Sequence, residues 1–139
     1  MNKYIVLLSL FLTAHGVFCE AQENNGVSTI YFMRSTGLSG GSGAFSAFID
    51  DSLACHLNNN RYSIHQTIPG LHKLQARFEG RKPKDKIQTL DITLQPGETY
   101  YISMSITNYG FYSNIYLIEV TKSTAKKMLK TLSEDSKCK

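Results

Sequence analysis

The sequence predicts an all-β domain, an antiparallel sandwich of seven to eight strands with one amphipathic helix near the C-terminus. Three observations support this fold class. Apolar and polar residues alternate with a period of two through most of the chain, clusters of Gly, Pro, Asn and Asp separate the alternating runs, and a single run close to the C-terminus has helical spacing. The chain of 139 residues corresponds to one domain and a removable leader.

The N-terminal segment, residues 1–21, has the pattern of an export signal. Lys3 supplies the positive start, and residues 4–12 (YIVLLSLFL) form an apolar core that is too short to span a bilayer. Small residues fit cleavage after Ala21, so the mature chain begins at Gln22 and reaches the first strand through a short linker, residues 22–27. We therefore expect an exported protein, either periplasmic or secreted.

Cys19 offers an alternative, because a lipoprotein signal is cleaved just before a cysteine that then receives lipid. Phe18 directly precedes Cys19, and the resulting "GVFC" is a poor match to the small residues such a signal needs. An envelope lipoprotein anchored through Cys19 remains the alternative, and contact with a membrane is expected only in that case. A leader that is never cleaved is a third possibility.

The first half of the domain reads as short strands separated by turns. The run at 28–36 (STIYFMRST) is apolar on both faces, which is typical of a central strand. In the run at 53–57, Leu53, Cys55 and Leu57 alternate and are expected to share a buried face. The remaining expected elements here are a small-residue loop at 37–43, a strand at 44–50, and turns at 50–52 and 58–60.

Two Pro-Gly pairs, Pro69-Gly70 and Pro96-Gly97, each follow an apolar strand end and precede a new alternating strand. Both predict tight structural corners, since Pro fixes φ and Gly allows positive φ. At the first corner, a three-residue loop that places Ile68 opposite His72 would put the apolar residues of both strands on one face. A switch of the chain to the facing sheet is the other solution.

The chain ends with further strands and one helix. The runs at 89–94 and 99–107 alternate cleanly, and Tyr101 falls on the face expected to meet solvent. A last strand at 114–122 precedes a helix at 123–132, with Ser123 as N-cap, that caps the sandwich. The folded domain thus covers 28–133, and 134–139 form a polar tail.

Charge and cysteine content argue against several functions. The net charge of +4 is modest, and its basic residues cluster at 81–86 and after residue 122, as on solvated surfaces. We expect no nucleic-acid partner. Cys55 reads as a small apolar core residue and Cys138 lies in the tail; an exported compartment would permit their pairing, which the sequence leaves open.

No constellation of residues indicates catalysis, a metal or a cofactor. His65 and His72 fall on opposite faces in the expected register, so they cannot converge on a metal ion. Asp50 and Asp51 are adjacent and read as a turn rather than as an acid/base pair. Because a strand follows the glycine-rich loop at 37–43, that loop lacks the helix start of a phosphate-binding site. A hydrolytic enzyme using His72 is the remaining catalytic alternative.

The candidate contact site is the loop at 107–114 (TNYGFYSN), which gathers rings and amides: Tyr109, Phe111, Tyr112, Asn108 and Asn114. Exposed rings give large contact areas, and amides give directional hydrogen bonds. The expected ligand is an envelope protein or a glycan. The competing interpretation is that the rings fold over the end of the sandwich as a plug.

Several stretches resemble a bacterial family known as domain of unknown function twenty-eight forty-six. The resemblance covers about residues 28–121, through "TIYFMR", "FSAFIDDSLACHLNNNRYSIHQTIPGLHKLQA" and "LDITLQPGETYYISM". Its most specific positions are Pro69, Gly70, His72, Gly97, Tyr100 and Tyr101. The chain departs from the family pattern at Ser35, where Pro is usual, and at Asp51, where Gly is usual.

The resemblance implies a small exported sandwich of the PEGA, immunoglobulin or prealbumin-like kind, frequently a lipoprotein, without an established activity. It implies no site residue. Together with the residue patterns, it predicts a non-catalytic cell-envelope domain that binds or scaffolds in the periplasm or at the membrane surface.

Overall fold

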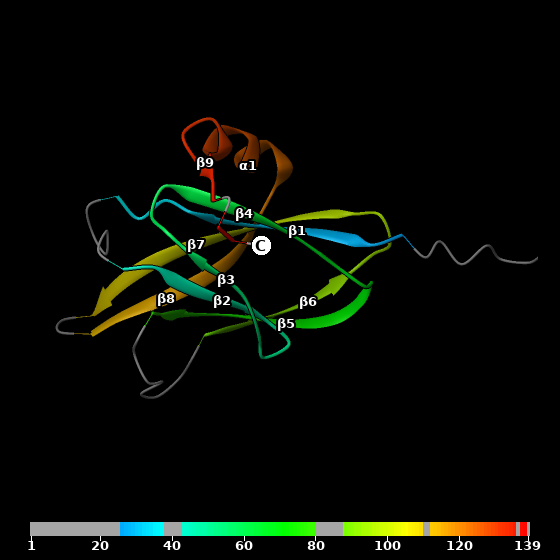
Figure 1. Cartoon of the computed structure of the whole chain (residues 1–139), viewed down its shortest axis with the longest axis horizontal. Coiled ribbons are helices and arrows are strands. Elements are labelled where there is room, and N and C mark those ends of the chain that lie inside the picture. The colour runs from blue at the N-terminus through cyan, green and yellow to red at the C-terminus, as the bar shows by residue number, and fades with distance from the viewer. Residues whose placement is uncertain (1–25, 38–42, 80–87, 110–111, 136, 139) are drawn as a thin grey trace, which may run out of the picture.

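The computed structural model describes residues 26–37, 43–79, 88–109, 112–135 and 137–138, which form nine strands and one helix. The strands make two facing sheets (Figure 1). The five-stranded sheet has the order β8 (Tyr112–Val120), β7 (Thr99–Tyr109), β1 (Ser28–Arg34), β4 (Arg61–Thr67), β9 (Ser133–Glu134). The four-stranded sheet has the order β3 (Ser52–Leu57), β2 (Phe45–Ile49), β5 (Gly70–Phe78), β6 (Thr89–Leu94).

The predicted fold class, a β-sandwich with one helix near the C-terminus, is confirmed. β1 is the central strand of its sheet, as its two apolar faces predict. Two details differ from the expectation. β1 pairs with β7 in parallel, and the two-residue β9 in the tail adds a ninth strand by pairing in parallel with β4.

Both Pro-Gly pairs carry the chain from one sheet to the other. β4 belongs to the five-stranded sheet and β5 to the four-stranded sheet, while β6 and β7 make the reverse crossing. The three-residue hairpin that pairs Ile68 with His72 is therefore wrong, and the sheet switch is correct. Gly70 and Gly97 have φ of 135° and 75°, which glycine tolerates best.

Because the chain switches sheets after β4, the apolar side chains of β4 lie on the outer face of its sheet and its polar side chains lie on the core face. In the β1–β4 ladder, Ile30 is opposite His65 and Phe32 is opposite Ser63. Opposite residues share a face, and Ile30 and Phe32 belong to the main core, so Ser63 and His65 point inward. Ile64 is consequently exposed on the outer face of the sheet.

A register shift changes the expected face of Leu53. The β2–β3 ladder pairs Ala47 with Cys55 but Phe48 with Leu53, because the ladder shifts between Ala47 and Phe48. Cys55 and Leu57 are buried as predicted, whereas Leu53 is exposed and does not share their face.

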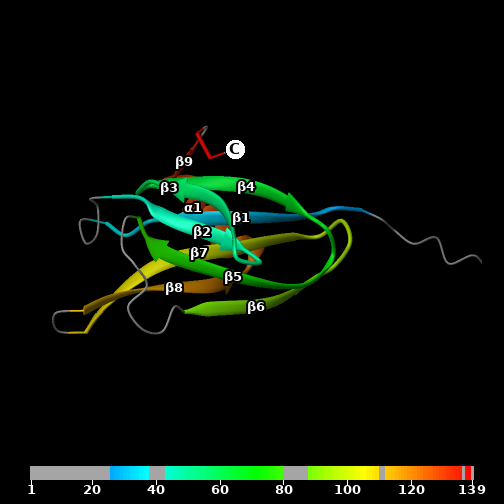
Figure 2. The same ribbon diagram turned by 60° about the horizontal axis from the view of Figure 1, so that its bottom comes forward.

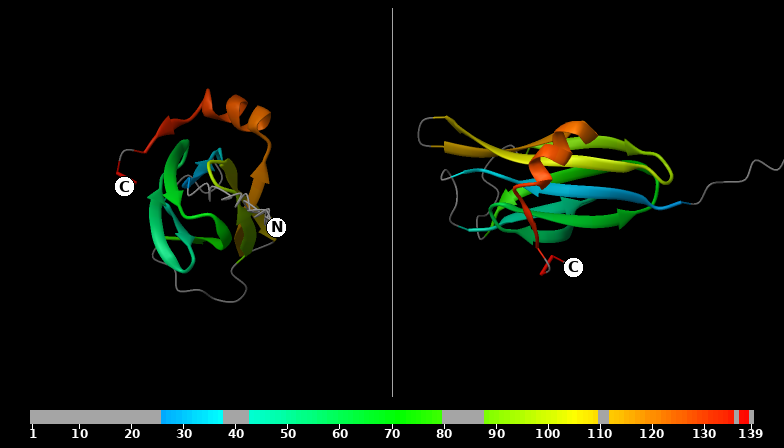
Figure 3. Two further views of the ribbon diagram at one scale, coloured as in Figure 1. Left: turned by 90° about the vertical axis from the view of Figure 1, so that its right-hand side faces the viewer. Right: turned by 90° about the horizontal axis from the view of Figure 1, so that it is seen from above.

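The helix α1 (Lys122–Leu129) lies against the outer face of the five-stranded sheet and not over an end of the sandwich (Figure 3). Its Ala125 packs with Met33 in a second apolar cluster, and Tyr101, expected at the solvent, packs there too. The N-cap is Thr121 rather than Ser123, and its Oγ1 accepts a hydrogen bond from the N–H of Thr124. Within the described residues, no helix is both long and apolar enough to cross a bilayer.

Candidate functional site

The segment expected to be the contact loop is largely a two-stranded ribbon. β7 continues to Tyr109 and β8 starts at Tyr112, and the ladder pairs Thr107 with Asn114. Its next two rungs join Asn108 to Ser113 and Tyr109 to Tyr112. Asn114 is exposed, whereas Phe111 lies outside the described residues. The candidate residues therefore belong to one hairpin, here called the β7–β8 hairpin (residues 105–116).

The β7–β8 hairpin extends past its neighbour β1 (Figure 2). The pairing of β1 with β7 ends at Arg34 and Met104. Asn59 draws the next residues of the chain toward the β3–β4 turn, because its Oδ1 accepts from the N–H of Thr36 at 3.0 Å and its Nδ2 donates to the carbonyl of Gly37 at 2.7 Å. Beyond Met104, β7 thus pairs only with β8 among the described strands, as a projecting binding element would.

His72 is buried beside the first Pro-Gly corner, as predicted, and it is bonded to the backbone there. Its Nε2 donates to the carbonyl of Ile68 at 2.8 Å, and its Nδ1 lies 2.6 Å from Oδ2 of Asp50. The carboxylate beside His72 thus comes from the β2–β3 turn and not from the strands that flank the corner. Since both ring nitrogens are engaged, His72 has no free lone pair with which to accept a proton from a substrate.

Asp50 was expected only as a turn residue, and it does lie in the tight β2–β3 turn with φ of 50°. Its Oδ1 also accepts from the N–H of Lys73 at 2.9 Å. This backbone hydrogen bond, together with His72, lowers the pKa of the Asp50 carboxyl. Asp50 and His72 are 22 residues apart and meet only because β2 and β5 are neighbours.

Ser46, His56 and Glu79 gather on the outer face of the four-stranded sheet and resemble a hydrolase triad in composition only. Ser46 Oγ lies 2.9 Å from His56 Nδ1, and Glu79 Oε1 lies 3.9 Å from the same nitrogen. A triad places the nucleophile and the acid on opposite ring nitrogens. Here both groups lie on the Nδ1 side of the ring, so the three residues do not have the geometry of a triad.

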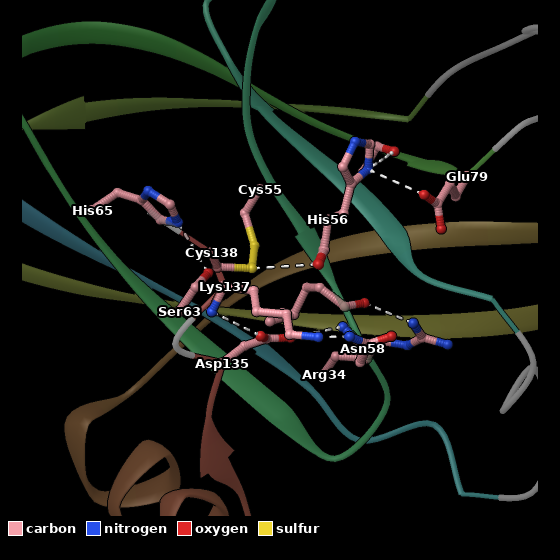
Figure 4. The surroundings of a disulfide bond; sticks show 12 residues. Arg34, Cys55, His56, Asn58, Ser63, His65, Glu79, Asp135, Lys137 and Cys138 are labelled. Carbon is pink, nitrogen blue, oxygen red and sulfur yellow. Dashed lines mark hydrogen bonds and ion pairs between the residues drawn. A yellow bond between two sulfur atoms is a disulfide. The ribbon is translucent and has the colours of Figure 1, made fainter.

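A disulfide joins Cys55 on β3 to Cys138 in the tail, across 83 residues and with the Cα atoms 4.9 Å apart (Figure 4). Both cysteines are buried in the main core. The expectation that Cys55 faces the core is confirmed, and the pairing that the sequence left open is present in the structure.

Hydrogen bonds fasten the rest of the tail around the β3–β4 turn. Ser133 donates its N–H to the carbonyl of Asn60, and Asp135 donates its N–H to the carbonyl of Tyr62 at 2.8 Å. Oδ2 of Asp135 accepts from Nδ2 of Asn58 at 3.2 Å (Figure 4). Residues 133–135 and 138 are thus attached to the domain, whereas the sequence predicted a polar tail from residue 134.

Buried polar groups near the disulfide have structural partners. Arg34 is fully buried; one guanidinium nitrogen donates to the carbonyls of Leu57 at 2.7 Å and Gly43 at 2.9 Å, and the group lies over the Phe45 ring. Burial lowers the pKa of Arg34 to about 10. Burial also lowers the pKa of His65, whose Nε2 lies 3.0 Å from Ser63 Oγ.

Among the residues that the structure describes, no three His, Cys, Asp or Glu side chains gather in a group that could hold a metal ion. His65 and His72, the two candidate metal ligands, lie in different sheets. His65 contacts Ser63, and His72 contacts Asp50.

A family model described as "Protein of unknown function (DUF2846)" matches residues 24–120. The chain belongs to this family. The DUF2846 match includes β1 to β8 and both Pro-Gly corners, and it ends before α1 and Cys138. The family expected from the sequence is thereby confirmed. A search of curated proteins gave no match.

Proposed function

We propose that this DUF2846 protein is an exported, non-catalytic module of the cell envelope that binds a partner, either a protein or a glycan, through its β7–β8 hairpin. The observation that carries the proposal is the disulfide between Cys55 and Cys138.

The disulfide supports export because such bonds persist in oxidising compartments and are rare in a reducing cytosol. The leader pattern at residues 1–21 points to the same compartment. The two observations are independent, since one lies in the N-terminal segment and the other ties the C-terminal tail to the core.

A non-catalytic role is supported by how the candidate catalytic groups are used. Both nitrogens of His72 hold the first corner in place, and Ser46 and Glu79 share one nitrogen of His56. Neither arrangement places a nucleophile and a carboxylate on opposite nitrogens of one imidazole ring, as a catalytic triad requires.

Binding through the β7–β8 hairpin is supported by its extension beyond β1 and by its composition. Rings and amides concentrate in residues 108–114, and such residues give contact area and directional hydrogen bonds. Beyond Ile106 and Ile115, which pack in the main core, Ser113 and Asn114 are exposed and accessible to a partner.

Fractionation of a bacterial host tests export. The full chain is expected in the envelope fraction, and a chain lacking residues 2–21 is expected in the cytosol. Recovery of the full chain from the cytosol with free thiols would refute export. Site-specific photo-crosslinking then tests the contact surface: a photoreactive residue at Asn114 is expected to yield adducts, while one at the exposed Thr93 on β6 serves as the matched control. Equal yields from both positions would refute a binding role for the hairpin.

A further inference from the structure

One border of the five-stranded sheet is an open edge. β8 lies outside β7, and no described strand pairs with its other side (Figure 2). It runs for nine residues (YSNIYLIEV), each of which pairs with β7 in one continuous register. In such an antiparallel pair, alternate residues direct their N–H and C=O groups away from the partner strand. These groups form a template on which a further strand can pair.

The other three border strands carry features that hinder such pairing. β9 has two residues, and the tail that contains it is tied to the core through Cys138. β3 shifts register beside β2, and an irregularity of this kind twists an edge away from a partner. β6 has six residues with the exposed Asp91 in its middle, whereas the one charged residue of β8, Glu119, lies next to its end. β8 is therefore the border strand best suited to pair with another chain.

A second copy of the chain brings a strand that matches this edge. Two copies of β8 can pair antiparallel about a two-fold axis normal to the sheet, which gives an isologous interface. An axis at Tyr116, the middle residue of β8, uses all nine residues of both copies. Leu117 then lies opposite Ile115 of the second copy, so apolar residues of the core face meet. Glu119 lies opposite Ser113 on the same face, so polar residues meet as well.

The charge of Glu119 distinguishes this register from its neighbours. An axis one residue closer to the C-terminus sets Glu119 opposite Ile115, and an axis two residues closer sets it opposite Leu117. An axis one residue closer to the N-terminus sets Leu117 opposite the polar Ser113. With the axis at Tyr116, the two Glu119 carboxylates are also far apart, roughly 20 Å along the ladder.

The paired edges have the hydrogen-bond content of an ordinary protein interface. A ladder of nine antiparallel rungs carries about eight to ten hydrogen bonds, and protein interfaces typically carry about ten. The pairing also covers one side of Ile118, which is 52% exposed on β8. The two five-stranded sheets then continue as one sheet across the axis.

We propose that the protein partner of the β7–β8 hairpin is a second copy of this chain, paired β8 to β8 about a two-fold axis at Tyr116. This inference rests on the proposed binding role of the hairpin and names its partner. Because the two strands are antiparallel, the two hairpins point toward opposite ends of the joined sheet.

Disulfide trapping tests the axis directly in the chain that starts at Gln22, whose two native cysteines are paired with each other. In the Tyr116→Cys variant the two new Cβ atoms lie about 5 Å apart across the axis, so mild oxidation should yield a covalent dimer. The control is Ile118→Cys, at a more exposed position of the same strand. Its two thiols lie about 14 Å apart along the ladder and should not join.

Sedimentation of charge variants gives a second measurement that leaves the core untouched. Ser113→Glu places a carboxylate opposite Glu119 of the second copy at two symmetric points, and it should raise the dimer dissociation constant roughly tenfold. Ser113→Lys should lower this constant instead, because the opposed charges then attract. Adding Glu119→Lys to Ser113→Glu should restore the dimer. Ser113 and Glu119 are exposed, so folding is expected to be preserved in each variant.

A chain that is still monomeric at about 100 μM would overturn the pairing of copies. Equal disulfide yields from Tyr116→Cys and Ile118→Cys would overturn it too, as would equal dissociation constants for the two Ser113 variants. Photo-adducts at Asn114 with another protein or a glycan, from a chain that is itself monomeric, would refute the pairing alone. Equal adduct yields from Asn114 and Thr93 would instead refute the binding role of the hairpin.

Discussion

Removal of the disulfide by Cys138→Ser should strongly destabilise the domain. The bond closes a loop of 83 residues in the unfolded chain, and a loop of this length corresponds to about 4–5 kcal/mol of stabilisation through lost chain entropy. For a domain of this size, 1 kcal/mol corresponds to roughly 4 °C in Tm, so a decrease of about 15–20 °C is expected.

Thermal unfolding followed by circular dichroism measures this effect. Cys138→Ser leaves the tail's hydrogen bonds at Asn60 and Tyr62 available, so the variant reports mainly on the covalent link. The matched control is Lys137→Ser, at the exposed neighbour of Cys138 outside the disulfide, which should leave Tm unchanged. If Tm of the unsubstituted protein is the same with and without reductant, then the disulfide does not contribute as reasoned here.

Three further predictions concern the core and two titrating groups. Leu74→Ala on β5 should cost about 2–5 kcal/mol in urea unfolding because Leu74 is fully buried, while Leu71→Ala on the same strand should cost about 0.5 kcal/mol or less; similar costs would contradict the assigned facing of β5. The pKa of Asp50 is lowered in the folded state, so the ionised carboxylate stabilises the fold above pH about 4, and this contribution is lost as the pH falls through the folded pKa. The Asp50→Asn variant should therefore lose less stability in acid than the unsubstituted protein. The lowered pKa of His65 means that the unfolded chain binds more protons below pH about 6.5, so stability should decline there, and a His65→Gln variant that declines equally would exclude His65 as the cause.

Local sequence patterns determine those parts of the fold that depend on local geometry. Ile30 and Phe32 alternate with Tyr31 and Met33, and the strand that contains them packs against the main core on one side and the helix cluster on the other. The Pro-Gly pairs are corners because Pro fixes φ and Gly allows positive φ in any fold.

Features that depend on partners distant in sequence could not be predicted in the same way. β4 turns Ser63 and His65 inward because β1 fixes its register, which its own alternation does not encode. Asp50 and His72 meet through the order of strands in a sheet, and Cys138 reaches Cys55 through the path of the whole tail. In each case the deciding contact joins residues more than 20 positions apart.

The assignment of each strand to one of the two sheets also determines which apolar side chains are exposed to solvent. Ile68 reads as a core residue in its own strand, yet the sheet switch at Pro69-Gly70 leaves it exposed beside Leu71. The exposure of Ile68 and Leu71 can therefore be predicted only once the crossing between sheets is known.

Intact-mass analysis of the protein purified from its native host, after alkylation without reductant, tests the proposed export most directly. The account predicts a chain that starts at Gln22, carries no alkyl group, and gains two on Cys55 and Cys138 only after reduction. A mass that includes lipid on Cys19 would show that the exported protein is anchored to a membrane and is not freely soluble. A mass that retains residues 1–21, with alkyl groups already present on Cys55 and Cys138, would contradict the account.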